Sequence, residues 1–111
     1  MAPTKPEVLQ GTLDLLVLRT IDAIGPMHGW GVAKRIEQVS GDALRLAQGT
    51  IYPALIRLEQ RGWIAAEWGM SDTSRKARFY TITKAGRRQL REEKESWERM
   101  VAIINQVLEK A

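Results

Sequence analysis

Residues 48–63 read QGTIYPALIRLEQRGW and predict a short helix with two distinct faces. The first face is apolar, and its residues recur at helical spacing: Ile51, Leu55 and Leu58. The second face is small and cationic, and it consists of Thr50, Ala54, Arg57 and Arg61. Pro53 is expected in the first turn, where a missing N–H costs little, and Gly62 stands where a helix often ends.

A helix of this kind suits the DNA major groove. Small residues near its start would let it sink into the groove, and Arg57 and Arg61 would then meet base edges or phosphate oxygens. The alternative is an ordinary amphipathic helix with a solvated basic face. The segments around the helix decide between the two interpretations.

Length and composition predict one folded domain with a modest core. The chain has 111 residues, of which 44% are hydrophobic. It has no Cys and a single His, His28, so no metal site and no cofactor are expected; His28 is predicted to be a packed or capping residue. Neither a signal peptide nor a membrane-spanning run is recognisable, which predicts a cytoplasmic protein without membrane contact.

The positive charge is concentrated in the middle of the chain. The net charge is +4, but residues 34–91 contain twelve basic and five acidic residues. Residues 1–33 and 92–111 are slightly acidic. A localised basic region indicates a polyanionic partner.

Two helices are expected before residue 48. Residues 1–8, with two prolines, are predicted to be an arm. Residues 9–24 are apolar on most of a helix circumference, with Leu15 and Leu18 off the main stripe, so a second subunit is expected on one side. A helix over 29–39 would turn Val32, Ile36 and Val39 inward. Residues 44–47 alternate and predict a very short strand.

The pattern changes to strand periodicity after Gly62. Residues 63–68 and 79–83 predict two strands, and the polar loop between them carries three cations. Three helices followed by such a hairpin predict a winged helix-turn-helix. The alternative for the loop is a solubilising segment without contacts.

The last helix is predicted from Lys84 to about Glu109. Residues 90, 97 and 104 repeat by seven, with 101 and 108 beside them, which indicates a coiled-coil-like seam. A terminal helix of this length has little of its own domain left to cover. We therefore expect it to pack on a second subunit.

Several motifs resemble the PadR family of bacterial transcriptional regulators. They are LQGTL at 9–13, HGWGV at 28–32, GTIYPAL at 49–55, RLEQRGWI at 57–64 and RFYTITKAG at 78–86. The short chain is similar to the branch with a single C-terminal helix. The resemblance implies an α+β, mainly α winged helix-turn-helix with an N-terminal helix and a long C-terminal dimerisation helix. Residues 1–86 would form the DNA-binding domain and 87–111 the dimerisation helix.

The resemblance also implies a function and a set of site residues. Family members are mostly repressors, and some respond to small aromatic ligands. Tyr52 and the helix around it would meet DNA, and the wing would be cationic. The predicted DNA-contacting residues are Lys34, Arg35, Gln48, Thr50, Tyr52, Arg57, Arg61, Arg75, Lys76 and Arg78.

Trp97 resembles a Trp that lines a cavity at the dimer interface in multidrug-sensing members. The predicted ligand and dimer residues are Val8, Leu15, Arg19, Trp97, Met100, Val101, Ile104 and Leu108. The alternative is that Trp97 only fills the dimer core.

The predicted function is therefore a homodimeric repressor that binds a pseudo-palindromic operator in double-stranded DNA and is released by a small aromatic effector. The second hypothesis is a winged-helix protein-interaction module without DNA binding, which would need no basic face. An enzyme is not expected, because the sequence shows no acid, base and nucleophile constellation and hence no catalytic residue.

Overall fold

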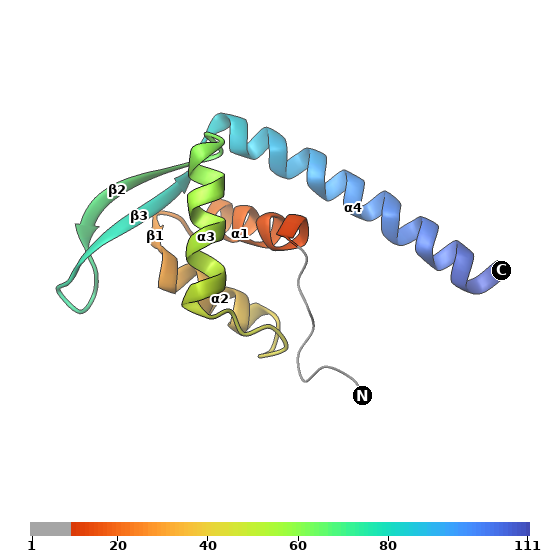
Figure 1. Cartoon of the computed structure of the whole chain (residues 1–111), viewed down its shortest axis with the longest axis horizontal. Helices are drawn as coiled ribbons and strands as arrows, with labels where there is room; N and C mark the ends of the chain where they lie inside the picture. Colours follow the sequence, from red (N-terminus) through yellow and green to blue (C-terminus); the bar gives the residue numbers. More distant parts are fainter. Residues whose placement is uncertain (1–9) are drawn as a thin grey trace.

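The computed structural model describes residues 10–111, in which four helices pack with a small antiparallel sheet that lies at one side of them (Figure 1). The elements are α1 (Gln10–Ile24), β1 (Met27–His28), α2 (Gly29–Val39), α3 (Gln48–Gln60), β2 (Ile64–Met70), β3 (Lys76–Ile82) and α4 (Lys84–Lys110). The order confirms the mainly helical winged helix-turn-helix. The predicted arm, with Val8, lies outside the described residues.

The sheet has the order β1-β3-β2, and both pairings are antiparallel. In the β2–β3 hairpin Ile64 faces Ile82 at one end and Met70 faces Lys76 at the other. Both strands extend further toward the turn than predicted, so Lys76 and Arg78 belong to β3 and not to the loop.

Two features of the sheet differ from the sequence prediction. Strand β1 was not predicted, because two residues carry no periodicity and the strand exists only by pairing with β3. The strand predicted at 44–47 is wrong, since this segment is irregular. Its alternation has another cause: Leu46 is buried in the core and Arg45 is exposed.

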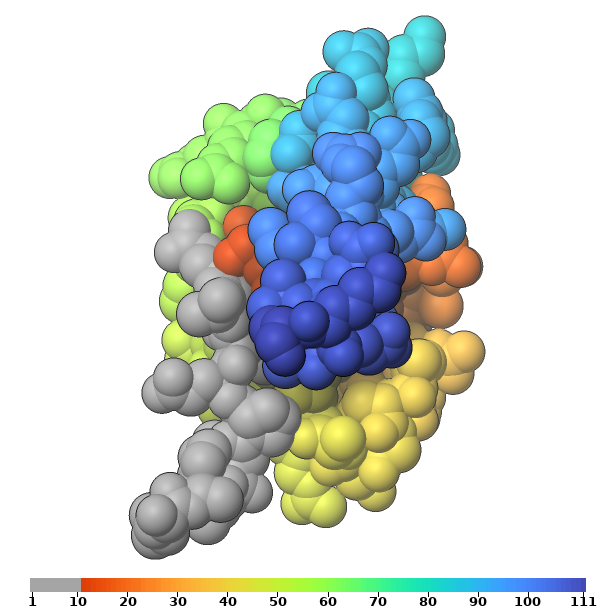
Figure 2. Space-filling model, turned by 90° about the vertical axis from the view of Figure 1, so that its right-hand side faces the viewer, coloured from red at the N-terminus to blue at the C-terminus, as the bar shows by residue number. Residues whose placement is uncertain are grey.

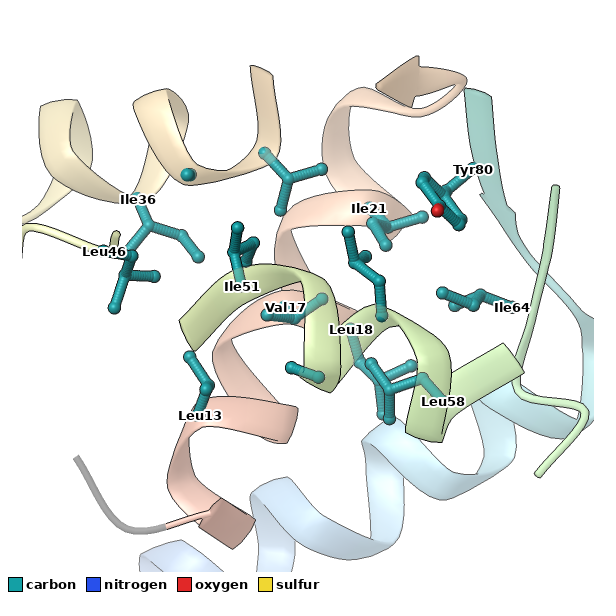
Figure 3. Packing of buried hydrophobic residues seen from close by; sticks show 14 of the residues in the cluster. Leu13, Val17, Leu18, Ile21, Ile36, Leu46, Ile51, Leu58, Ile64 and Tyr80 are labelled. Carbon is teal, nitrogen blue, oxygen red and sulfur yellow. The ribbon is translucent and has the colours of Figure 1, made fainter. Parts of the chain in front are cut away.

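Helix α1 lies at the centre of the core (Figure 3). It contributes Leu13, Val17, Leu18 and Ile21, which pack with α3 residues of the predicted apolar stripe, Ile51, Leu55 and Leu58. Leu18 was expected to face a second subunit, but it is fully buried in its own domain. Most of the circumference of α1 is covered by α2, α3, β3 and α4 of the same chain.

Helix α3 ends as the sequence predicts. Gly62 adopts a φ of 76°, its N–H donates to the Glu59 carbonyl at 3.0 Å, and the Trp63 N–H donates to the Leu58 carbonyl at 3.0 Å. This is the Schellman arrangement that glycine favours. Pro53, however, lies beyond the first turn, where it removes one N–H from the helix.

The start of α2 fits closely against α3. The Nδ1 atom of His28 accepts a hydrogen bond from the Gly31 N–H at 3.0 Å, which confirms the expected capping role. A Cβ on Gly29 would lie 2.7 Å from Leu55 Cδ1 and 2.9 Å from Tyr52 Cε1, so a larger residue would force these side chains to shift. At the other end of α2 the prediction for Val39 is wrong, because this residue is 73% exposed.

Helix α4 begins on the domain and then leaves it. Thr83 caps the helix by accepting from the Gly86 N–H at 3.0 Å, and Leu90 is its last buried apolar side chain. Beyond that point α4 projects away from the core, on the side opposite the hairpin (Figure 1), and Figure 2 looks along it from its free end. Within residues 10–111, no helix is long and apolar enough to cross a membrane.

Candidate nucleic-acid interface

The exposed face of α3 borders a groove. Its exposed residues are Gln48, Gly49, Thr50, Tyr52, Pro53, Ile56 and Gln60. The groove has a volume of about 700 Å³ and lies between the start of α2, α3 and the β2–β3 hairpin. The β2–β3 hairpin is the wing of the fold. Because it stands beside α3 (Figure 1), the helix and the wing flank one continuous surface.

Two tryptophan rings line this groove, and each has a cation beside it. The Lys34 ammonium lies 5.5 Å from the ring centroid of Trp30, and the Lys76 ammonium lies 5.7 Å from that of Trp68. The Arg78 guanidinium lies 6.0 Å from the Trp68 ring. Trp30 and Trp68 are 40% and 66% exposed, so the flat rings and the charges beside them are open to a partner.

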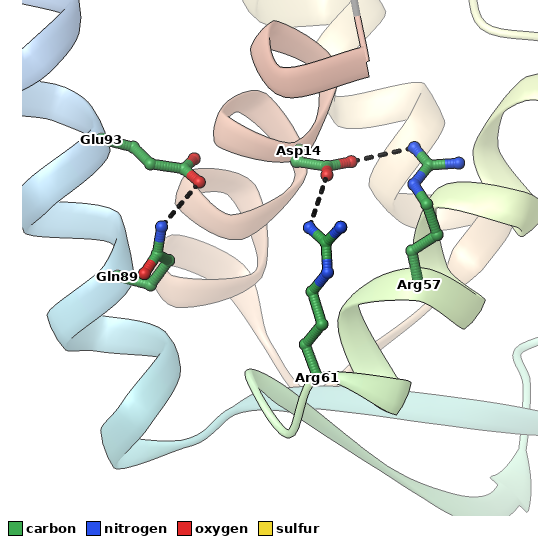
Figure 4. Close-up of polar contacts among 5 residues, drawn as sticks. All are labelled: Asp14, Arg57, Arg61, Gln89 and Glu93. Carbon is green, nitrogen blue, oxygen red and sulfur yellow. Dashed lines mark hydrogen bonds and ion pairs between the residues drawn. The ribbon is translucent and has the colours of Figure 1, made fainter.

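The predicted small and cationic face of α3 is not exposed as a unit, while DNA contact by Thr50, Arg57 and Arg61 stays a prediction. Ala54 is fully buried, and Arg57 donates to the Asp14 carboxylate on α1 at 3.0 Å. Arg61 lies 3.7 Å from the other oxygen of Asp14 (Figure 4). Arg57 and Arg61 both reach toward α1, whereas Thr50 at the start of the same predicted face is exposed.

The Asp14 pairs have a clear physical cause. The Asp14 side chain is only 3% exposed, and a buried carboxylate needs cations and hydrogen bonds to offset its desolvation. Arg57 is half-buried, with 27% of its side chain exposed, whereas Arg61 retains 48%. Arg57 therefore fixes α3 on α1, while Arg61 keeps part of its guanidinium in solvent.

Arg78 connects the wing to α3. Its guanidinium donates to Glu59 at 2.6 Å. This hydrogen bond, together with the negative charge of Glu59, raises the pKa of Arg78 above its usual value. Next to it, burial raises the pKa of the Tyr80 hydroxyl. Arg78 thus has an acidic partner on α3 within the domain.

The tip of the wing leaves two cations free of acidic partners. The Ser71 N–H donates to the Arg75 carbonyl at 2.8 Å, and Ser74 closes the turn with a φ of 60°. Arg75 and Lys76 are exposed, and no ion pair within residues 10–111 engages either one. They are the cations of the hairpin best placed to contact a polyanion.

The two predicted cations of α2 lie on different sides. Lys34 does not line the groove itself, but its ammonium lies beside the ring of Trp30, which does. Arg35 instead lines a hollow of about 280 Å³ between α1 and the end of α2 and contacts Gln38 at 3.4 Å. The structure therefore places Lys34 at the border of the candidate interface and Arg35 away from it.

The predicted ligand and dimer residues also separate into two groups. Leu15 and Arg19 line a hollow of about 470 Å³ between α1 and α4. The others lie on the projecting part of α4, where most are about half exposed: Trp97, Met100, Val101, Ile104 and Leu108. The hollow between α1 and α4 is lined by Leu15 and Arg19 but by none of these α4 residues.

Sequence reasoning did not identify Trp30, Ile56 and Trp68 as interface residues. Helical spacing places Ile56 off the stripe of Ile51, Leu55 and Leu58, a signal of exposure that the sequence analysis did not use. Trp68 ends the predicted strand and carries no signal of its own. All three side chains are exposed beside the wing, and this position can be recognised only from the tertiary structure.

Comparisons with known proteins agree with this architecture. The chain is similar to a transcriptional regulator from Clostridium thermocellum, with 27% identity, coverage of 91% of this chain and 97% of that one, and a TM-score of 0.80. It is also similar to a PadR family transcriptional regulator from Eggerthella lenta, with 28% identity, coverage of 92% and 86%, and a TM-score of 0.79.

A protein of Lysinibacillus sphaericus described only as uncharacterized protein X is 26% identical over 105 residues, which is 95% of each chain. The family described as transcriptional regulator PadR-like matches residues 17–92, a span that runs from α1 into α4 and includes α3 and the wing. This chain therefore belongs to the PadR-like family of transcriptional regulators.

Proposed function

We propose that this protein is a homodimeric, sequence-specific DNA-binding repressor that is released by a small aromatic effector. One observation carries the DNA-binding part: the exposed face of α3 and the free cations Arg75 and Lys76 flank the same groove. A recognition helix in the major groove, with a cationic wing on the adjacent backbone, needs this arrangement.

The roles of the basic residues follow from their partners. Arg75, Lys76 and Lys34 are free to neutralise phosphates, which supplies affinity without sequence preference. Gln48, Thr50 and Tyr52 lie on the exposed face of α3 and contact bases or backbone. Arg57 acts mainly by holding α3 on α1, and Arg61 uses its exposed part to reach a phosphate.

Dimer formation rests on the uncovered half of α4. Six large apolar side chains are 47–77% exposed there: Trp97, Met100, Ile103, Ile104, Val107 and Leu108. Leaving such an apolar stripe exposed to water is unfavourable in free energy. The same stripe of a second subunit therefore covers it across a two-fold axis. The two α3 helices of such a dimer meet successive major grooves of a pseudo-palindrome.

The effector site follows from the same dimer. Two Trp97 rings approach each other near the axis and stack on a planar guest, with Met100 as an adaptable wall. The Leu15 and Arg19 hollow between α1 and α4 extends the site toward the domain. A guest that spreads the α4 helices changes the spacing of the recognition helices and lowers DNA affinity, provided that it prefers the spread state.

A selection experiment tests the proposal. The purified protein is mixed with a random library of DNA duplexes, and bound molecules are amplified and sequenced over several rounds. We expect enrichment of one motif with two-fold symmetry. Absence of any enriched motif, together with equal affinity for all duplexes, would support a winged-helix protein-interaction module and contradict a sequence-specific regulator.

A further inference from the structure

Ile56 is exposed on the part of α3 that faces outward. Its side chain is 52% exposed and lines the groove beside the wing. The core stripe of α3 is complete without it, because Ile51, Leu55 and Leu58 are fully buried. Ile56 is also remote from the exposed stripe of α4, since the wing and the free end of α4 project to opposite sides (Figure 1). The domain fold therefore gives no reason for an isoleucine here.

The surroundings of Ile56 allow close approach to a DNA base. One turn earlier the helix exposes Pro53, and another turn earlier Gly49, where an added Cβ would meet no atom within 4 Å. No long charged side chain therefore precedes it on this face. The neighbouring Arg57 is paired with Asp14 on α1, so the guanidinium next in sequence to Ile56 is directed to the core side of the helix.

We propose that Ile56 selects thymine in the operator by contacting its 5-methyl group. This inference rests on the DNA-binding function proposed above. In the major groove, thymine is the base that presents a methyl group, while the other bases present polar edges. An isoleucine side chain offers these edges no hydrogen bond, and covering them would leave polar groups desolvated. The chemistry of the side chain therefore favours thymine at one position of each half-site.

The test removes the methyl group without changing the hydrogen bonds of the base pair. In the duplex enriched by selection, each thymine is replaced singly by deoxyuridine, which lacks only the 5-methyl group. Burial of one methyl group corresponds to a change in affinity of about fourfold. We expect a loss of that size at one thymine per half-site, and about fifteenfold when both half-sites are replaced.

Two variants assign the effect to this residue. Ile56→Ala is expected to bind the thymine duplex more weakly and to lose the distinction between thymine and deoxyuridine at that position. Ile56→Val, with one methyl group fewer, should retain a smaller distinction. Val39→Ala is the matched control, because Val39 is an exposed aliphatic residue on α2 that does not line the groove. It should keep the full distinction.

The outcomes separate this inference from the proposed function. If the unaltered protein binds the enriched duplex but tolerates every deoxyuridine, the DNA-binding function stands and thymine selection is overturned. The same holds if Ile56→Ala, shown to be folded by its circular dichroism, keeps the full distinction. If the protein binds no duplex at all, the proposed function itself fails, and the role of Ile56 fails with it.

Discussion

Asp14 on α1 accepts a hydrogen bond from Arg57 on α3 at 3.0 Å, and only 3% of the Asp14 side chain is exposed. The pair joins the central helix of the core to the helix that faces the groove. Arg57 was predicted to point outward as a free cation, but through this pair it positions α3. The position of the exposed face of α3, and thus of Ile56 and Tyr52, depends on this contact.

We expect Asp14→Ala to destabilise the fold strongly. The substitution leaves the half-buried Arg57 without its carboxylate, and breaking a buried pair in this way costs about 3–5 kcal/mol, less where one partner is partly exposed. The measurement is urea unfolding at a fixed protein concentration, since a dimer unfolds with concentration dependence. The matched control is Asp22→Ala on the same helix, whose pairs with Arg19 and Arg87 are more exposed and contribute about 0–1 kcal/mol. Equal losses in both variants would refute a special role for Asp14.

The wing prediction concerns salt dependence. Replacing Arg75 or Lys76 by Ala should weaken DNA binding about equally for all sequences and reduce the slope of log affinity against log salt by about one unit. The free cations contact phosphates, which carry no sequence information. Fluorescence anisotropy at several salt concentrations gives the slope. Arg88→Ala, on α4 and away from the groove, removes the same charge and should leave the slope unchanged. A sequence-dependent loss with the parental slope would speak against phosphate contacts.

The dimer prediction concerns the exposed stripe of α4. Ile104→Lys places a charge in that stripe on both subunits and removes two isoleucines from the interface. Each buried isoleucine contributes about 1.5–3 kcal/mol, so the dimer should weaken more than about a hundredfold. Gln106→Lys adds the same charge on the opposite face of α4 and should leave the dimer intact. Sedimentation analysis compares the two variants, and an unchanged dimer in Ile104→Lys would place the interface elsewhere.

The effector prediction concerns Trp97. Planar aromatic cations and phenolic acids are titrated while tryptophan fluorescence is followed in the parent protein and in Trp97→Ala. Because four Trp residues contribute to the signal, the difference between the two proteins is the relevant quantity. We expect saturable binding that Trp97→Ala abolishes, since the indole supplies the stacking surface. Equal binding in both proteins, or none in either, would leave Trp97 as part of the dimer core only.

The sequence predicted the order of elements because each long element carries its own periodicity. The segments of α2, α3, the hairpin and α4 agree with the predictions within a few residues. It could not predict β1, which depends on pairing with a distant strand, or show that residues 44–47 are irregular. The local sequence pattern shows how residues are spaced along one element. It does not show which distant residues that element packs against.

The same limit explains the error at Arg57. Spacing placed Arg57 with Ala54 and Arg61, but which side of α3 faces solvent depends on how α1 packs against it. One signal was present in the sequence: Asp14 is flanked by Leu13 and Leu15 on the apolar side of its helix, and a buried acid requires a cation. Only the tertiary structure identified that cation.

The most direct test of the dimeric DNA-binding claim is a hydroxyl-radical footprint of the protein on its enriched duplex. Two copies of α3 related by a two-fold axis predict two protected regions whose centres lie about 10–10.5 base pairs apart, on the same side of the helix. Protection of a single half-site, or two regions on opposite sides of the DNA, would contradict the account.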